Sequence, residues 1–394
     1  MSEKNIKNNG ENGATLIVFV ILLPVLIGFA AFAIDFGYRH VVRNELQNIA
    51  DASALATAGE LGKSYKGMTY TEQQDYVANR ELLVGIAQTT ASKNLGGNLP
   101  ITIADSDVTI GKWDFESRTF KEITLNQPDA IRVVARRETG ANSPIPTFFA
   151  NIFGIESMEV RALATAALSG QSTADPGELE LPVGISKFWF DEDYCNDHIK
   201  FYPTNDPDSC AGWDSFTNSP SNDSKLRDIL GNSLLQPGDP GYEETLDSPF
   251  VQSGETEFEF IGGTMSNPTF DALLTAFQHL GYDVDANGVP VSSPAQAIPL
   301  YGENGTTPLY YPDGTARNRH IWETTVAVYD SNDCSNPNQS IVVEGFARVR
   351  ITDVQDSPEK TIIGEVICDY VSPEDTRGGG GSFGTKGSIP GLVE

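Results

Sequence analysis

The chain has 394 residues and a formal net charge of −28, from 26 basic and 54 acidic side chains. The imbalance lies almost wholly in the carboxy-terminal part: residues 1–170 carry 15 basic and 18 acidic side chains, whereas residues 171–394 carry 11 and 36. So negative a surface repels phosphate backbones, which excludes nucleic acid as a partner, and the step in charge predicts a domain boundary near Gly170.

An apolar run from Ala14 to Ile34 predicts one membrane-spanning helix, because about twenty residues at roughly 1.5 Å each cover the ~30 Å hydrocarbon core of a bilayer. A cleaved secretory signal is the alternative. Signal cores are shorter, however, and end at a small-residue cleavage site, which the polar residues from Asp35 onward do not offer. We therefore expect residues 1–13 to be a polar tail and residues 14–34 to be a retained transmembrane helix.

Three residues of this region carry specific expectations. Pro24 and Gly28 lie inside the span, where membrane helices tolerate them either as a bend in a plain anchor or for packing on a partner helix. Asp35 follows the apolar run directly. A lone carboxylate at this depth is expected at the membrane interface or paired with a partner chain.

Residues 35–62 predict an amphipathic stalk helix that continues the span. Apolar or small residues recur on one stripe at spacings of four and three residues: Val42, Leu46, Ile49, Ser53 and Ala56, with Ala50, Ala54 and Ala58 on an adjacent narrow face. Such a stripe packs either on the protein's own domain or on neighbouring subunits of an assembly. Leu46 and Ile49 are therefore candidates for an assembly helix.

Residues 63–170 predict a small α+β domain below the stalk. A helix is expected over residues 71–93, and strands are expected over residues 107–113, 119–125, 130–137 and 158–168. Helices, strands and a returning last strand place the chain in the α+β class, with a long amino-terminal transmembrane and stalk helix.

The acidic part of the chain is predicted to be a second domain. Residues 171–180 have the composition of a linker. Residues 181–376 are expected to be rich in β-strands after Arg319, with helices over residues 219–231 and 268–280. The Gly-rich residues 377–394 are expected to form a flexible or docking tail.

All four cysteines, Cys195, Cys210, Cys334 and Cys368, lie in the acidic domain. None forms a C-x-x-C pair and no histidine completes a tetrahedral set, so a zinc site is not expected. In an oxidising compartment the even number predicts two disulfides. Of the three pairings we favour the most local one, Cys195 with Cys210 and Cys334 with Cys368.

Several motifs occur in the order that one protein family shows. The stretch GATLIVFVILLPVLIGFAAFAIDFGYRHVVRNELQNIADASALATAGEL, followed by AIRVVARRETG, PTFFANIFGI and MEVRALATAAL, resembles the TadE/TadG-like Flp pilus assembly proteins over about residues 10–170. The resemblance implies a cytoplasmic amino terminus, a helix in the bacterial inner membrane and an exported domain that builds or decorates a Flp/Tad pilus, with other Tad subunits as partners.

Two features depart from that family's pattern. Many TadG-like proteins carry a von Willebrand A domain with an Asp-x-Ser-x-Ser turn, and the nearest stretch here, Asp330 to Cys334, lacks that spacing. Tad pilins are cut after a Gly with a Glu five residues further on, whereas Val18 stands five residues after Gly13. Processing of this kind is therefore not expected.

Catalytic motifs are missing from the sequence. It contains no H-E-x-x-H and no G-x-S-x-G, so we expect neither an enzyme nor a cofactor. The best ligand candidate is calcium, because Asp283, Asp285 and Asn287, followed by Gly288, match the first half of a calcium loop. Pro294 stands where such loops place a bidentate Glu, and Asn-Gly also favours a hairpin turn, so a plain turn is the alternative.

The sequence thus supports two hypotheses. The first is a membrane-anchored, non-enzymatic TadG-like subunit that assembles a Flp/Tad pilus or is a minor component of it. The alternative is a calcium-dependent adhesin, or another protein that binds a surface ligand, held by a single membrane anchor. The two differ in whether calcium stabilises the carboxy-terminal domain.

Overall fold

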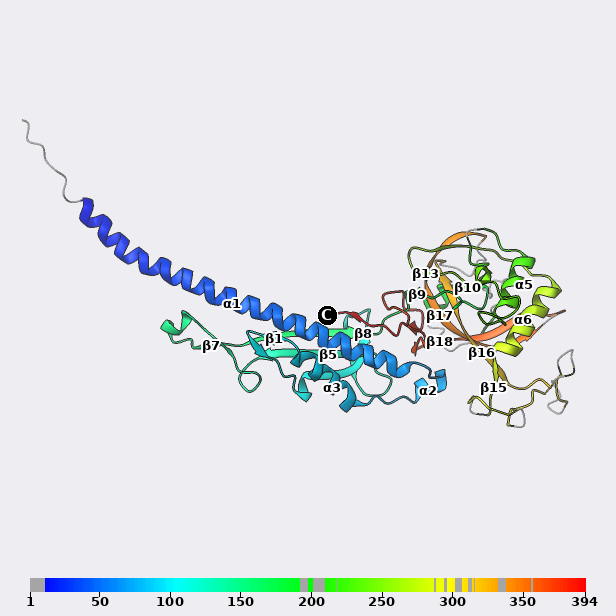
Figure 1. Ribbon diagram of the computed structural model, residues 1–394. Coiled ribbons are helices and arrows are strands. Elements are labelled where there is room, and N and C mark those ends of the chain that lie inside the picture. Colours follow the sequence, from blue (N-terminus) through cyan, green and yellow to red (C-terminus); the bar gives the residue numbers. More distant parts are fainter. Residues whose placement is uncertain are drawn as a thin grey trace, which may run out of the picture.

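The computed structural model describes the chain in several ranges, which are 11–191, 198–200, 210–217, 219–286, 288–293, 296–301, 307–310, 314, 316–331, 338–355 and 357–394. Two domains follow one long helix along this chain. Figure 1 shows the first domain along the carboxy-terminal half of that helix and the second domain beyond its carboxyl end, while the amino-terminal part of the helix projects alone.

Helix α1 (Glu11–Tyr65) is unbroken over 55 residues and contains Pro24. At about 1.5 Å per residue it is roughly 80 Å long. It is long and apolar enough to cross a membrane, and of its most apolar 18-residue window only 6% is buried, unlike the core helix of a globular domain. Large apolar side chains such as Leu16 and Phe29 stand exposed at 66% and 70%. This supports the expected anchor.

The second half of α1 is buried in the first domain. Its stripe packs on α3 (Arg80–Ser92), β5 (Ala130–Arg137) and β8 (Val160–Ala167). The stripe's own domain, not a neighbouring subunit, therefore covers it. Ala56 is exposed, contrary to the prediction, and Thr57 is buried instead. A straight helix drifts by about 20° per heptad against a strict 3.5-residue spacing, so the buried set moves by one residue.

The first domain's sheet has five antiparallel strands in the order β21-β8-β5-β3-β4. Its other strands are β3 (Val108–Asp114), β4 (Thr119–Ile123) and β21 (Gly391–Leu392). Shorter elements connect them: β1 (Leu95–Gly96), β2 (Leu99–Pro100), η1 (Asp105–Asp107), β6 (Ile145–Pro146), η2 (Ala150–Phe153) and β7 (Ser157–Met158).

The single helix predicted over residues 71–93 is in fact two, α2 (Tyr70–Gln74) and α3. The chain between them pairs with the end of the β4 segment, where Ala78 N–H donates to the Leu125 carbonyl at 2.8 Å. Asn79 then caps α3 by accepting from Leu82 N–H. Long-range pairing and a strong N-cap residue therefore overrode the local helical pattern.

The second domain is built on a mixed sheet with the order β11-β18-β17-β16-β10-β12. These strands are β10 (Val183–Ser186), β11 (His198–Lys200), β12 (Ala211–Trp213), β16 (His320–Tyr329), β17 (Gln339–Gln355) and β18 (Thr361–Ile367), with β14 (Glu257–Phe260) on β17 and β15 (Tyr282–Asp283) on β16. Helices α5 (Asp223–Asn232) and α6 (Asn267–Leu280) pack together and contribute to its core.

Short elements complete the described chain. They are β9 (Thr173–Ala174), α4 (Phe188–Asp191), η3 (Glu244–Leu246), β13 (Val251–Gln252), β19 (Tyr370–Val371) and β20 (Thr385–Lys386). The α+β class with a long amino-terminal helix and a β-rich carboxy-terminal domain is thus confirmed. Cys210 and Cys368 are buried and neither is a free thiol, whereas Cys195 and Cys334 lie outside the described residues.

The Gly-rich tail docks on the chain itself and completes the first domain. Strand β21 pairs with β8, opposite Ala166 and Ala167. Lys386 of β20 is half-buried and forms ion pairs with Asp129 at 2.7 Å and Asp369 at 3.1 Å. Glycine is required where the tail meets the linker, because a Cβ atom at position 380 would lie 2.2 Å from the Gln171 carbonyl oxygen. The acidic domain is therefore inserted between two strands of the first.

Helix α2 fixes the second domain at the carboxyl end of α1. The side-chain amide of Gln73 donates to the Val371 carbonyl and accepts from Val371 N–H, both at 2.9 Å, and Gln73 is buried. The guanidinium of Arg350 lies 4.8 Å from the centre of the Tyr70 ring. Because the Gln73 side chain bonds both backbone groups of Val371, it holds the second domain in one orientation relative to the first domain and the stalk helix.

The pH dependence of the second domain's stability is predicted to involve Asp214. Its Oδ1 accepts from Phe216 N–H at 2.8 Å, and its Oδ2 has no hydrogen-bond partner in the described part of the chain. Burial raises the pKa of the Asp214 carboxyl well above its usual range. The unfolded chain releases this proton near pH 4 while the folded chain keeps it, so this group lowers stability as pH rises above that value.

We therefore expect Asp214→Asn to raise the melting temperature at pH 7 and to change it much less at pH 4, because the amide needs no proton to be neutral. Thermal unfolding followed at both pH values measures this difference. Asp228→Asn, an exposed position on α5, is the control. An equal gain at pH 4 and pH 7 would contradict the assignment.

Candidate functional site

A buried carboxylate, that of Asp35, lies where the apolar segment of α1 ends. Asp35 is 1% exposed and its carboxylate accepts three backbone hydrogen bonds: from Phe148 at 2.7 Å, from Phe149 at 3.0 Å and from Ala150 at 2.6 Å. These amides begin the loop of residues 147–156, between β6 and β7, which we call the junction loop. The carboxylate therefore ties this loop to the side of α1.

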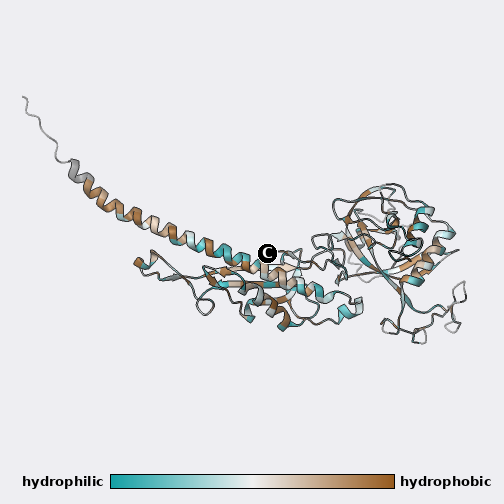
Figure 2. Ribbon diagram, in the orientation of Figure 1, coloured by the Kyte–Doolittle hydropathy of each residue, from teal (hydrophilic) through white to brown (hydrophobic). Residues whose placement is uncertain are grey.

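Aromatic side chains extend the contact along the helix in both directions. The ring of Phe153 stacks on Phe32 with 5.6 Å between centroids, and the ring of Phe148 meets Tyr38 edge to face at 5.3 Å. Phe32 precedes Asp35 and Tyr38 follows it, so the junction loop runs along α1 toward its apolar half. Figure 2 shows brown, hydrophobic residues at the tip of this loop as well as along the free half of α1.

A buried arginine holds the base of the junction loop. The Arg137 side chain donates to the carbonyl oxygens of Asn142 at 3.0 Å, Ser143 at 2.8 Å, Gly96 at 3.0 Å, Gly97 at 3.3 Å and Pro144 at 3.4 Å. Arg137 itself is 3% exposed. Its planar fork satisfies carbonyl groups of residues 142–144 and of the turn between β1 and β2.

The turn between β1 and β2 is also attached to α1. The Glu45 carboxylate accepts from Gly97 N–H at 2.7 Å. Gly97 has a φ of +62°, and a Cβ atom there would lie 2.8 Å from the Arg137 guanidinium. Glycine is thus needed both for the turn and for the close approach.

Comparison with protein families identifies the region that contains this site. Residues 13–60 match the family model for Flp pilus-assembly TadE/G-like proteins, and residues 47–166 match that for Tad-like Flp pilus-assembly proteins. Residues 13–166 are thus a TadE/TadG-like Flp pilus-assembly region. The two matched ranges cover α1, the first domain's main strands and the junction loop, and leave the acidic domain unmatched. No curated protein and no solved structure matches the chain.

The predicted assembly-helix residues in this TadE/TadG-like region lie in different environments. Leu46 and Ile49 are 0% and 2% exposed in the core of their own domain, so neither presents a surface to another subunit. Gly28 lies in the free half of α1 with no atom within 4 Å of an added Cβ. Asp35 is bonded to backbone amides of its own chain, not to a partner chain, because the junction loop folds back onto it.

Sequence reasoning did not connect Asp35 with the junction loop. The two are 113 residues apart in the sequence, and backbone amides leave no trace in the residue types. One signal was present, however. The segment TFFANIFGI is apolar without the alternation of a strand or the length of a buried helix, which is typical of a segment that meets another apolar surface.

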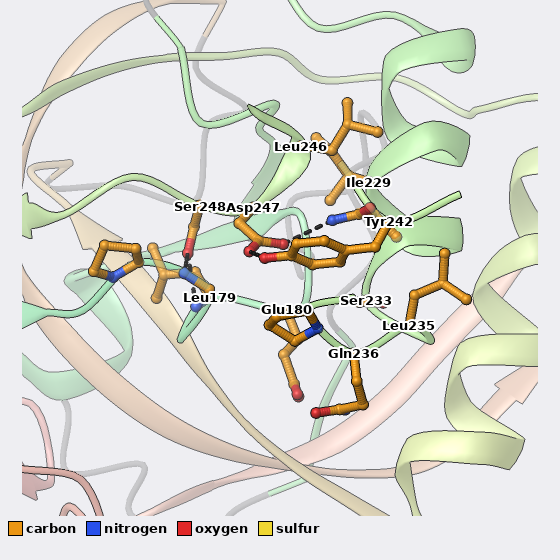
Figure 3. A pocket seen from close by; sticks show the side chains of 14 residues that line it. Leu179, Glu180, Ile229, Ser233, Leu235, Gln236, Tyr242, Leu246, Asp247 and Ser248 are labelled. Carbon is orange, nitrogen blue, oxygen red and sulfur yellow. Dashed lines mark hydrogen bonds between the residues drawn. The ribbon is translucent and has the colours of Figure 1, made fainter. Parts of the chain in front are cut away.

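A cavity in the acidic domain, shown in Figure 3, has a volume of about 220 Å³. Asp247 projects toward it and accepts from the Asn232 amide at 2.7 Å and from the Tyr242 hydroxyl, and this bond raises the pKa of Tyr242 to about 12. Glu180 accepts from the Trp322 indole at 3.2 Å. These polar groups thus bind one another, which is typical of a structural cavity.

The predicted calcium ligands take other partners. The Asp283 carboxylate accepts from the Asn318 amide and lies 2.8 Å from His320 Nδ1, and Asp285 accepts from Val289 N–H at 3.1 Å. Asn287 lies outside the described residues. Within the described ranges no three metal-binding side chains gather. Calcium binding therefore stays a prediction that these contacts do not favour.

His320 and Asp283 form a pair like that of a hydrolase, but the pair is not arranged for catalysis. His320 Nε2 lies 2.9 Å from the carbonyl oxygen of Phe277. Because both ring nitrogens face acceptors, neither is free to take a proton from a serine. The arrangement fastens β16 to the end of α6.

Proposed function

We propose that this chain is a single-pass membrane subunit that acts in the assembly of a Flp/Tad-type pilus or is a minor component of it. Its amino terminus is cytoplasmic, α1 crosses the inner membrane, and both domains lie on the outer side. Its partners are other Tad pilus subunits or assembly proteins. The acidic domain is the part presented to the surroundings or to a surface ligand.

The observation that carries this proposal is the division of α1 into two halves of opposite character. Residues from Leu16 to about Ile34 are largely exposed and apolar, whereas Val42 to Leu61 bury one face in the first domain. One unbroken helix thus connects a membrane-spanning segment to the folded domains. A soluble protein would not leave so large an apolar surface uncovered.

The position of the acidic domain supports outward presentation. It is attached near Tyr65, the carboxyl end of α1, about 45 Å beyond Asp35 at 1.5 Å per residue. A buried amide of Gln73 and the half-buried ammonium group of Lys386 fix it there through polar contacts. A rigid stalk keeps a strongly negative domain away from the anionic surface of the bilayer.

Crosslinking in cells tests the proposal. A photoreactive residue at Val25, which is 52% exposed on the free half of α1, is expected to crosslink to another pilus protein and to lose that product in cells without the other Tad components. The same residue at Glu116, exposed in the turn after β3, is the control. If fractionation finds the protein wholly in the inner membrane with no crosslink to any pilus component, the proposed function fails.

We also propose two disulfides in the acidic domain, because Cys210 and Cys368 are buried and neither is a free thiol. Their expected partners, Cys195 and Cys334, lie outside the described residues. The local pairing of Cys195 with Cys210 and of Cys334 with Cys368 therefore stays the prediction.

Peptide mapping without reductant is expected to recover Cys195 linked to Cys210 and Cys334 linked to Cys368. Disulfides that close loops of this size stabilise by roughly 3–4 kcal/mol each, so reduction is expected to lower the melting temperature of the acidic domain. Recovery of Cys195 linked to Cys368 would contradict the local pairing. The control is the same chain taken through the same procedure without the reductant.

A further inference from the structure

The junction loop exposes far more apolar surface than a loop in water normally does. Five of its large apolar side chains are exposed: Phe148 at 58%, Phe149 at 36%, Ile152 at 78%, Phe153 at 60% and Ile155 at 44%. Within residues 147–156 the sequence has one charged side chain, Glu156, at the carboxyl end of the loop. A cluster of large apolar residues on a short loop marks a contact with another apolar phase or surface.

The position of the loop identifies that phase. Phe153 stacks on Phe32, and Phe32 is the third residue from the end of the apolar run Ala14 to Ile34. Asp35 and Tyr38 fix the loop against the same helix. Whatever surrounds Phe32 therefore also surrounds Phe153, and the loop's apolar side chains are continuous with the exposed surface of the span.

Most backbone amides of the junction loop are already hydrogen-bonded within the protein. Seven of its amide groups donate within the protein: those of 148, 149 and 150 to Asp35, that of Thr147 to Glu156, that of Ile152 to Phe149, that of Gly154 to Asn151 and that of Ile155 to Ala150. In hydrocarbon each unsatisfied group would cost several kcal/mol, so non-helical backbone is tolerated there only when it is paired.

We propose that the junction loop inserts into the leaflet around the carboxyl end of the span and is a second membrane contact, with lipid acyl chains as its ligand. This inference rests on the proposed membrane anchor. Phe148, Ile152, Phe153 and Ile155 enter the acyl boundary, while Asp35 keeps the buried amides satisfied. The loop thereby fixes the tilt and depth of α1, which a single helix does not fix by itself.

The charges beyond the loop match this placement. Arg39, His40 and Arg43 follow Asp35 on α1, and His40 and Arg43 are exposed. At 1.5 Å per residue they lie about 6 to 12 Å further from the bilayer centre, which is the headgroup layer. Basic side chains at that level attract the phosphates of anionic lipids.

Depth-dependent quenching tests the proposal in the full chain, with one copy per nanodisc of phosphatidylcholine and phosphatidylglycerol brominated along the acyl chains. In the variant Ile152→Trp, the emission of the added indole is expected to fall in brominated discs. Phe29→Trp, in the span and 70% exposed, reports whether α1 is inserted. Ile123→Trp, 76% exposed on β4, is expected to keep its emission. The unchanged chain gives the signal of the four native tryptophans.

The three positions separate the outcomes. Quenching at residues 29 and 152 but not at 123 supports insertion of the junction loop. Quenching at 29 alone overturns it and leaves the membrane anchor standing. Quenching at neither position overturns the anchor, and the inference fails with it. An emission change at 152 that requires several copies per disc assigns the loop to contact with another copy, which also overturns the inference.

Discussion

Asp35→Ala is expected to release the junction loop from α1. The substitution leaves three backbone donors without their acceptor, two of them at 2.6 and 2.7 Å. Hydrogen bonds to a charged group contribute about 1.5–3 kcal/mol each, and a buried donor left unsatisfied costs about 1–3 kcal/mol. We therefore expect a loss of roughly 3 kcal/mol or more in local stability, which is about a hundredfold faster amide exchange at Phe148, Phe149 and Ala150.

The exchange rate of these amides is measured by hydrogen–deuterium exchange and mass spectrometry on the full chain in nanodiscs. Asp51→Ala is the matched control, because Asp51 lies on the same helix, is half-buried and accepts one bond, from the Gln47 amide at 2.8 Å. Its effect on the junction loop is expected to be negligible. Unchanged protection at residues 148–150 in Asp35→Ala would show that the carboxylate does not hold the loop.

Arg137→Met is expected to destabilise the first domain as a whole. The substitution keeps the apolar stem of the side chain but removes every donor to the carbonyls of residues 96, 97, 142, 143 and 144. Leaving these groups unpaired in a buried place costs about 3 kcal/mol in total, within the upper range for single substitutions. The melting temperature should fall by about 6–12 °C, given about 2–4 °C per kcal/mol for domains of this size.

Thermal unfolding of the purified chain measures the change. Arg161→Met serves as the control, since Arg161 is exposed on β8, the strand next to β5, and the same charge is removed. A surface substitution of this kind changes stability by no more than about 0.5 kcal/mol. Similar melting temperatures for the two variants would contradict the role assigned to Arg137.

The elements that the sequence predicts well are those whose pattern is local. The strand over residues 130–137 is confirmed with the same bounds, and the helix predicted over 268–280 is found at Asn267–Leu280. In each case the apolar residues that recur with the period of the element are the ones that the fold buries. The helix predicted over 71–93 is wrong as a single element, because its break is set by pairing with residues 125 and 126, about fifty positions away.

The sequence by itself determined the long apolar helix, the stalk that continues it and the TadE/TadG-like character of residues 13–166, because each depends on residue type at short spacing. The tertiary structure decided which surface remains free. It buried Leu46 and Ile49 in their own domain, returned the tail to β8 and placed the junction loop on Asp35. These contacts join distant segments largely through backbone groups, and a backbone amide is the same in every residue that could have stood there.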